Sequence, residues 1–189
     1  MPWPEKFRET LQEQAPSLKA MIYEGYEGIS GDTPAKQRAA FWIKAMETLD
    51  AQLDFESKAA LMGANACCTD GPVGELLAER AERAKCLTLP ERLEIYNSDE
   101  YCKASMNDDG TLTVSIHNRR RKSYFCSCWQ FDGLRKIPEL SSTYCMCCAG
   151  NLRFHCQNVL GLQLKLKDVT SSCLNNAGKE PCAFIFEIC

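Results

Sequence analysis

The sequence has no run of about 18 apolar residues, so it predicts no segment that spans a membrane. Its start, MPWPEKFRETLQEQ, is charged early and lacks an apolar core, so we expect no secretory signal. The net charge of −3 gives no overall attraction for nucleic acid. A glycine-rich phosphate loop, a carboxylate pair and a nucleophile elbow are also missing. These absences favour a cytoplasmic chain without a nucleic-acid partner or a membrane span.

Histidine is scarce, which limits thiol–imidazole catalysis. A cysteine nucleophile needs an imidazole nearby, and the chain has only His117 and His155. His155 is adjacent to Cys156, but neighbouring helical positions point in different directions, so the two side chains would not face each other. We expect His155 at the surface and His117 at a strand end.

Cysteine is abundant, with 13 in 189 residues. The count is odd and no export signal is evident, so a disulfide scaffold is not expected. In a reducing compartment, cysteines serve as small buried apolar residues, metal ligands or reactive thiols. A basic run, NRRRK at 118–122, lies between strand-like segments and favours a solvated loop over a phosphate site.

The first half of the sequence predicts helices. Glycine and proline place a loop at 23–34, and Thr33 and Pro34 are expected to open the helix that follows it. Phe41, Trp42 and Met46 follow the helical period within that helix. The predicted helices cover 4–15, 33–52, 54–68, 72–85 and 89–99.

The second half changes to strand periodicity. NDDG predicts a hairpin turn between two strands, and the alternating LQLKLKDV and CAFIFEIC segments predict two more. The predicted strands cover 101–106, 111–117, 122–131, 162–169 and 182–189, and a long helix ends at Gly161. We therefore predict one compact α+β domain, with a helical part (1–95) packed on an antiparallel sheet (96–189) and the long helix inserted before the final hairpin.

The cysteines suggest a metal site. Cys173 and Cys182 flank one hairpin. A tetrahedral zinc site could add one thiol from CSC (126–128) and one from CMCC (145–148). The competing interpretation is core packing, since Cys145, Cys148 and Cys156 share one helical stripe. An iron–sulfur cluster is less favoured because no C-x₂-C-x₂-C run is present. The candidate metal ligands are Cys126, Cys128, Cys145, Cys147, Cys173 and Cys182.

The C-terminal stretch, CMCCAGNL followed by VLGLQLKLKDVTSSCLNNAGKEPCAFIFEI, resembles the end of 4-vinyl-reductase-type small-molecule-binding domains. It is also similar to L-2-amino-thiazoline-4-carboxylate hydrolase-like bacterial proteins. The shared elements are Gly161, the alternating strand, Cys173, Gly178, and Cys182 followed by Phe184. The resemblance covers about residues 95–189, and the first half only in its helical character.

The resemblance implies a zinc held by three cysteines and an acidic residue. Cys173 and Cys182 match two of those cysteines, and Cys147 corresponds to the third by position. Where the acidic ligand should lie, the sequence has YFCSCW and no Asp or Glu before Asp132, so Cys126 or Cys128 would replace it.

Three functions follow as hypotheses. The first is a small-molecule-binding protein with a structural zinc, whose apolar or aromatic ligand lies near Phe41, Trp42, Phe125 and Trp129. The second is a hydrolase of a small cyclic amide or thiazoline, using a metal-bound water or a cysteine nucleophile. The third is an interaction module with a flat apolar homodimer face and no cavity.

Overall fold

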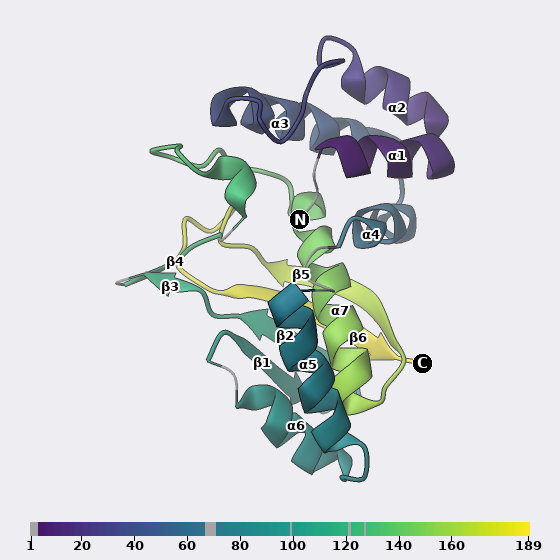
Figure 1. The fold of residues 1–189 in the computed structure, drawn as a ribbon, viewed down its shortest axis with the longest axis vertical. Helices are drawn as coiled ribbons and strands as arrows, with labels where there is room; N and C mark the ends of the chain where they lie inside the picture. The colour runs from purple at the N-terminus through teal and green to yellow at the C-terminus, as the bar shows by residue number, and fades with distance from the viewer. Residues whose placement is uncertain (1–3, 67–70, 99, 121, 127) are drawn as a thin grey trace.

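The computed structural model describes residues 4–66, 71–98, 100–120, 122–126 and 128–189, with backbone only for 71–73. The chain has an α+β fold, as predicted, with helices first and one long helix before the last two strands (Figure 1). The helices are α1 (Pro4–Gln14), α2 (Pro16–Tyr23), α3 (Ala35–Gln52), α4 (Phe55–Ala64), α5 (Gly71–Ala84), α6 (Leu89–Asn97) and α7 (Met146–Leu160). The strands are β1 (Cys102–Met106), β2 (Leu112–Ile116), β3 (Arg119–Arg120), β4 (Ser123–Tyr124), β5 (Leu164–Ser171) and β6 (Cys182–Ile188), and two 3₁₀ turns are η1 (Trp129–Phe131) and η2 (Ser142–Cys145).

Helices α1, α2 and α3 form a group with an aromatic core. Phe7 of α1 packs on Phe41 and Trp42 of α3, and the Tyr23 ring lies 5.0 Å from that of Phe41. The apolar period predicted for α3 is therefore its buried face. The predicted cap at Thr33 is shifted, because α3 begins at Ala35 and Pro34 takes the N-cap position without a side-chain hydrogen bond.

The main sheet is antiparallel, in the order β1-β2-β6-β5. Its register pairs Val114 with Phe184 and Leu112 with Phe186, which places these apolar side chains in the buried layer of the sheet. β6 follows the other strands in sequence but lies between β2 and β5. The alternation predicted for β5 and β6 is confirmed.

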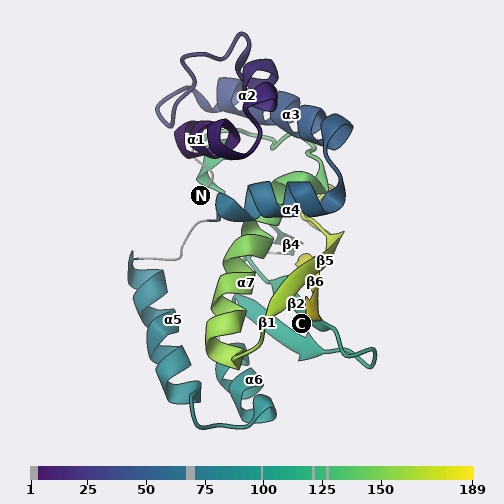
Figure 2. The ribbon, with the colours of Figure 1, turned by 90° about the vertical axis from the view of Figure 1, so that its right-hand side faces the viewer.

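Helix α7 is the centre of the C-terminal half. It packs against α4, α5, α6 and β5, and in Figure 2 it lies between α5 and the sheet. It ends at Gly161, whose φ of 70° is the left-handed conformation that glycine permits, as the sequence predicted. Within the described residues, no helix is both long and apolar enough to cross a bilayer.

The predicted strand at 122–131 is wrong in extent. Among the described residues of this segment, only Ser123–Tyr124 forms a strand, which pairs with Arg119–Arg120, and Trp129–Phe131 forms a 3₁₀ turn. Contacts with the N-terminal helices explain the change. Trp42 Nε1 donates to Gln130 Oε1 at 3.1 Å, and Arg38 Nε donates to the Gln130 carbonyl at 3.2 Å. These buried hydrogen bonds outweigh the strand preference of the aromatic residues.

Candidate functional site

A cavity of about 720 Å³ lies where α5, α6 and α7 face one end of the sheet. Its volume is within the range of roughly 300–1,000 Å³ found for small-molecule sites. One cross-strand row of the sheet contributes Cys102, Ile116 and Cys182, which are partners in register. The thiols in its wall belong to Cys102, Cys126, Cys128, Cys147, Cys148, Cys173 and Cys182.

The rest of the wall is largely carbon. Leu76 and Leu77 come from α5, Leu152 from α7, and Phe125 follows β4. Leu76 and Phe125 are nearly half exposed, so the cavity opens to solvent along their side. An apolar interior with exposed apolar residues at its opening is suited to an apolar or aromatic molecule.

The hairpin between β5 and β6 positions two of the thiols. It ends in a turn in which Ala177 and Gly178 both have positive φ, and the Gly178 N–H donates to the Cys173 carbonyl at 3.2 Å. The Tyr124 N–H donates to the Gly178 carbonyl at 2.9 Å, so the β3–β4 hairpin is tied to this turn. That bond brings Cys126 next to Cys173.

The start of α7 supplies the next three thiols. Ser141 caps the η2 turn by accepting from the Thr143 N–H at 3.2 Å, and α7 continues directly from that turn. Cys145 Sγ lies 3.1 Å from Ser172 Oγ, beside the β5–β6 turn. Cys147 Sγ donates to the Tyr144 carbonyl at 3.2 Å, while Cys148 faces the cavity.

Hydrogen bonds link the thiols in two neighbouring groups, which we together call the thiol cluster (Cys126, Cys128, Cys145, Cys147, Cys148, Cys173 and Cys182). Cys182 Sγ donates a hydrogen bond to Cys173 Sγ at 3.5 Å. The Cys126 thiol forms hydrogen bonds with the thiols of Cys173 and Cys128. The Cys145 thiol forms a hydrogen bond with the Cys182 thiol, and the Cys147 thiol forms one with the Cys148 thiol. The eleven cysteines that the structure describes carry free thiols.

The cluster changes the acidity of its members. A hydrogen bond with Cys182, together with burial, raises the pKa of Cys145. The converse holds at Cys182, because hydrogen bonds with Cys145 and Cys173 lower its pKa. Burial also raises the pKa of Tyr144, whose Oη lies 3.0 Å from Cys128 Sγ. Negative charge in the cluster is therefore favoured at Cys182.

All six cysteines proposed from the sequence as metal ligands lie in the thiol cluster. Cys148, which shares the predicted helical stripe with Cys145 and Cys156, also lines the cavity, as do Cys102 and Tyr144, which the sequence did not single out. Their signals were present: Cys102 lies in the predicted strand 101–106, and Cys148 belongs to CMCC (145–148). Cys67 and Cys68, also noted in the sequence, lie outside the described residues.

The cluster has the donor chemistry for a thiophilic metal but not a preformed site. Sulfur atoms around a tetrahedral zinc lie roughly 3.8 Å apart when the zinc–sulfur bonds are about 2.3 Å. The 3.5 Å between Cys173 Sγ and Cys182 Sγ is close to that separation. Within the described residues, however, no three His, Cys, Asp or Glu side chains are grouped so as to hold an ion as they stand. Binding would therefore require rotation of the thiol side chains.

The predicted pocket aromatics separate into two groups. Phe125 lines the cavity, whereas Phe41 and Trp42 are fully buried in the N-terminal helical core and do not line it. Their helical period reflected core packing. Trp129 is likewise outside the cavity wall, with the Arg38 guanidinium 5.0 Å above its ring.

His155 corrects another expectation, because it is buried rather than at the surface and lines the cavity. Helix α5 covers the face of α7 from which His155 projects. His117 follows β2, and its Nε2 lies 2.8 Å from Ser115 Oγ. A helical period does not reveal that a second helix will cover the polar face.

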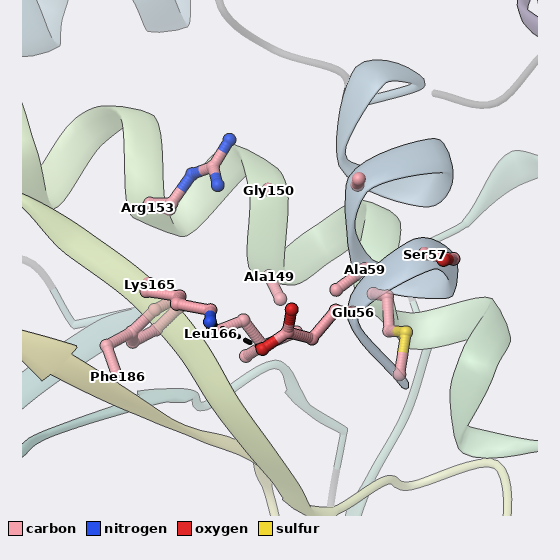
Figure 3. A pocket seen from close by; sticks show the side chains of 11 residues that line it. Glu56, Ser57, Ala59, Ala149, Gly150, Arg153, Lys165, Leu166 and Phe186 are labelled. Carbon is pink, nitrogen blue, oxygen red and sulfur yellow. Dashed lines mark hydrogen bonds and ion pairs between the residues drawn. The ribbon is translucent and has the colours of Figure 1, made fainter. Parts of the chain in front are cut away.

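A second cavity of about 410 Å³ lies between α4, α7 and β5 (Figure 3). Lys165 Nζ and Glu56 Oε1 form an ion pair at 2.5 Å that joins β5 to α4 across it. Ala149 and Leu166 contribute to its apolar side. Both paired charges are at least half exposed, and none of the thiols that the structure describes lines this space, so we consider the larger cavity the candidate site.

The fold and the larger cavity define an α+β protein with a thiol-lined cavity beside its sheet. No family model matches the chain, and no curated protein or solved structure matches it. The resemblance to 4-vinyl-reductase-type domains therefore stays a prediction from the C-terminal motif.

Proposed function

We propose that this chain is a cytoplasmic small-molecule-binding protein, with an apolar or aromatic ligand in the larger cavity and a structural zinc in the thiol cluster. One observation carries the proposal: a largely apolar cavity of about 720 Å³ that has seven thiols in its wall. A ligand in this space would bury apolar surface against Leu77, Ile116 and Leu152, which is favourable at roughly 25 cal/mol per Å².

The zinc would be held by Cys173 and Cys182, one of Cys126 and Cys128, and Cys145 or Cys147. Four thiolates would leave the ion no open position, so it would supply structural cross-linking rather than catalysis. These cysteines come from the segment after β4, the start of α7 and the two ends of the loop that joins β5 to β6. Bringing them together would fix the wall of the cavity.

The cavity also bears on the alternatives. An interaction module would need a flat apolar face, and the presence of a cavity favours a small-molecule ligand over it. The hydrolase hypothesis requires either an open metal position or a cysteine nucleophile, which the metal and thiol measurement below would reveal.

The ligand proposal can be tested with N-phenyl-1-naphthylamine, an uncharged apolar dye that fluoresces in apolar surroundings. We expect saturable binding by the wild-type protein. Replacing Ile116 with Trp would fill part of the cavity and weaken binding by about tenfold, since a cavity that loses space cannot bury the same ligand area. Ile188→Trp is the matched control, because it lies in the same sheet outside the cavity wall. If Ile116→Trp and Ile188→Trp bind the dye with the same dissociation constant, the cavity is refuted as the site.

The zinc proposal requires elemental analysis of protein purified without a metal-affinity tag, with free thiols titrated before and after chelation. We expect about one zinc per chain and three or four thiols released by the chelator. Cys173→Ser and Cys182→Ser should each lose the metal, while Cys86→Ser and Cys189→Ser, at exposed positions outside the cluster, should retain it. No metal with all thiols free would refute the zinc. A thiol alkylated at neutral pH in that case would favour the hydrolase.

A further inference from the structure

Arg119 and Arg120 of the basic run form β3, which pairs with β4 next to the larger cavity. Arg119 pairs with Tyr124 and Arg120 pairs with Ser123. Tyr124 lines the cavity, and the Arg119 guanidinium carbon lies 5.6 Å from the centre of its ring. Arg119 therefore lies beside a ring of the cavity wall, and because successive residues of a strand point to opposite sides, Arg120 points away from that ring.

Backbone hydrogen bonds hold the hairpin against the cavity. The Phe125 N–H donates to the Asn118 carbonyl at 3.0 Å, and both residues line the cavity. The bond from Tyr124 to the Gly178 carbonyl ties the hairpin to the β5–β6 turn. Arg119 therefore has a defined place on a ring that belongs to the wall.

Among the described residues beside this opening, basic side chains outnumber acidic ones. Within the wall, Arg80 and Glu100 contribute one charge of each sign, which cancel formally. Arg119 and Arg120 are exposed, and in the part of the chain that the structure describes neither forms an ion pair with a carboxylate. A guanidinium beside an apolar cavity can bind a planar or tetrahedral anionic group while the ligand's apolar body is buried.

We infer that the cavity takes an amphipathic anion: an apolar or aromatic body lies among the carbon and thiol side chains, and a carboxylate, sulfonate or phosphate pairs with Arg119. This inference rests on the proposed function, which supplies the apolar part of the site. It adds the chemical class of the ligand and assigns Arg119 as the residue that selects for charge.

The test uses two dyes that differ in one group. 8-Anilinonaphthalene-1-sulfonate is N-phenyl-1-naphthylamine with an added sulfonate, so the ratio of their dissociation constants isolates the anionic contact. We expect Arg119→Gln to weaken the sulfonate dye about fivefold, as for a partly exposed charge-assisted pair, and to leave the neutral dye unchanged. Arg120→Gln removes the same charge from the opposite side and should change neither dye by more than about twofold.

The outcomes separate the two proposals. If the neutral dye does not bind the wild-type protein, the apolar cavity and the proposed function are refuted. If the neutral dye binds and Arg119→Gln and Arg120→Gln weaken the sulfonate dye equally, or neither weakens it, the role of Arg119 is refuted while the cavity stands. If Arg119→Gln weakens both dyes equally, Arg119 supports the wall and does not select for charge, which also refutes the inference.

Discussion

Two glycines at the crossing of α4 and α7 should respond in opposite ways to the same substitution. A Cβ on Gly150 would lie 2.7 Å from Gly63 Cα, 3.0 Å from the Gly63 carbonyl oxygen and 3.2 Å from Ala66 Cβ. A Cβ on Gly63 would have Gly150 Cα at 4.0 Å as its nearest neighbour, an ordinary contact. The helices can therefore approach closely only because Gly150 lacks a side chain.

The magnitudes follow from packing and helix propensity. Gly→Ala within a helix gains roughly 0.5–1 kcal/mol. For Gly150→Ala, separating two backbones costs about 1–3 kcal/mol, so we expect a net loss of about 1–2 kcal/mol in the free energy of unfolding. For Gly63→Ala, near the end of α4, we expect a gain of up to about 0.5 kcal/mol.

Urea unfolding under reducing conditions, followed by circular dichroism, measures both variants against the wild type. Equal slopes of free energy against urea would show that the variants unfold from similarly compact states. A stabilised Gly150→Ala protein, or equal destabilisation by both substitutions, would contradict the close crossing of α4 and α7.

Two further substitutions test contacts that join the N-terminal helices to the rest of the chain. Burial opposes ionisation of Asp50, but hydrogen bonds from Lys58, Ser141 and Thr143 outweigh it and lower its pKa. Asp50→Asn should therefore cost about 1 kcal/mol at pH 7. The difference from wild type should shrink as the pH falls below about 4, because unfolded Asp50 becomes protonated first and folded Asp50 only at lower pH. A difference independent of pH in urea titrations would count against this. Arg38 is buried and donates to the carbonyls of four residues: Gly31, Thr33, Trp129 and Gln130. Arg38→Met leaves these acceptors without their donor and should cost about 2–4 kcal/mol by urea unfolding, and a loss under about 0.5 kcal/mol would show that the guanidinium does not hold η1 in place.

Much of the fold could be predicted from the sequence because its elements have strong local signals. α3 has a regular apolar period, Gly161 marks the end of α7, and the β1–β2 hairpin contains an Asp-Gly turn. The predictions failed where distant contacts decide the structure. The segment around Gln130 folds as a turn because Arg38 and Trp42 bind it, and no local pattern reveals those partners.

The same division applies to the site. The cysteine spacing identified six members of the thiol cluster, because hairpin ends and a helix start limit where their side chains can lie. Of the four predicted pocket aromatics, only Phe125 lines the cavity, because the helical period of Phe41 and Trp42 reflects core packing. Burial of His155 depends on α5, which is distant in sequence, so the polar face of α7 gave no warning of it.

The position of β6 in the sheet has a consequence for how the chain folds. β6 is synthesised after β1, β2 and β5, yet it lies between β2 and β5 in the sheet. The β1–β2 hairpin therefore forms first, and the edge of β2 that later pairs with β6 stays unpaired until β6 has been made. Pairing Val114 with Phe184 closes a long stretch of chain, and such non-local pairing slows folding. Until that closure, Cys182 is kept away from the start of α7. The nascent chain thus has an unpaired strand edge that can associate with other chains, and its thiols are exposed to solvent. The yield of folded protein should therefore depend on chaperones and on a reducing environment during synthesis.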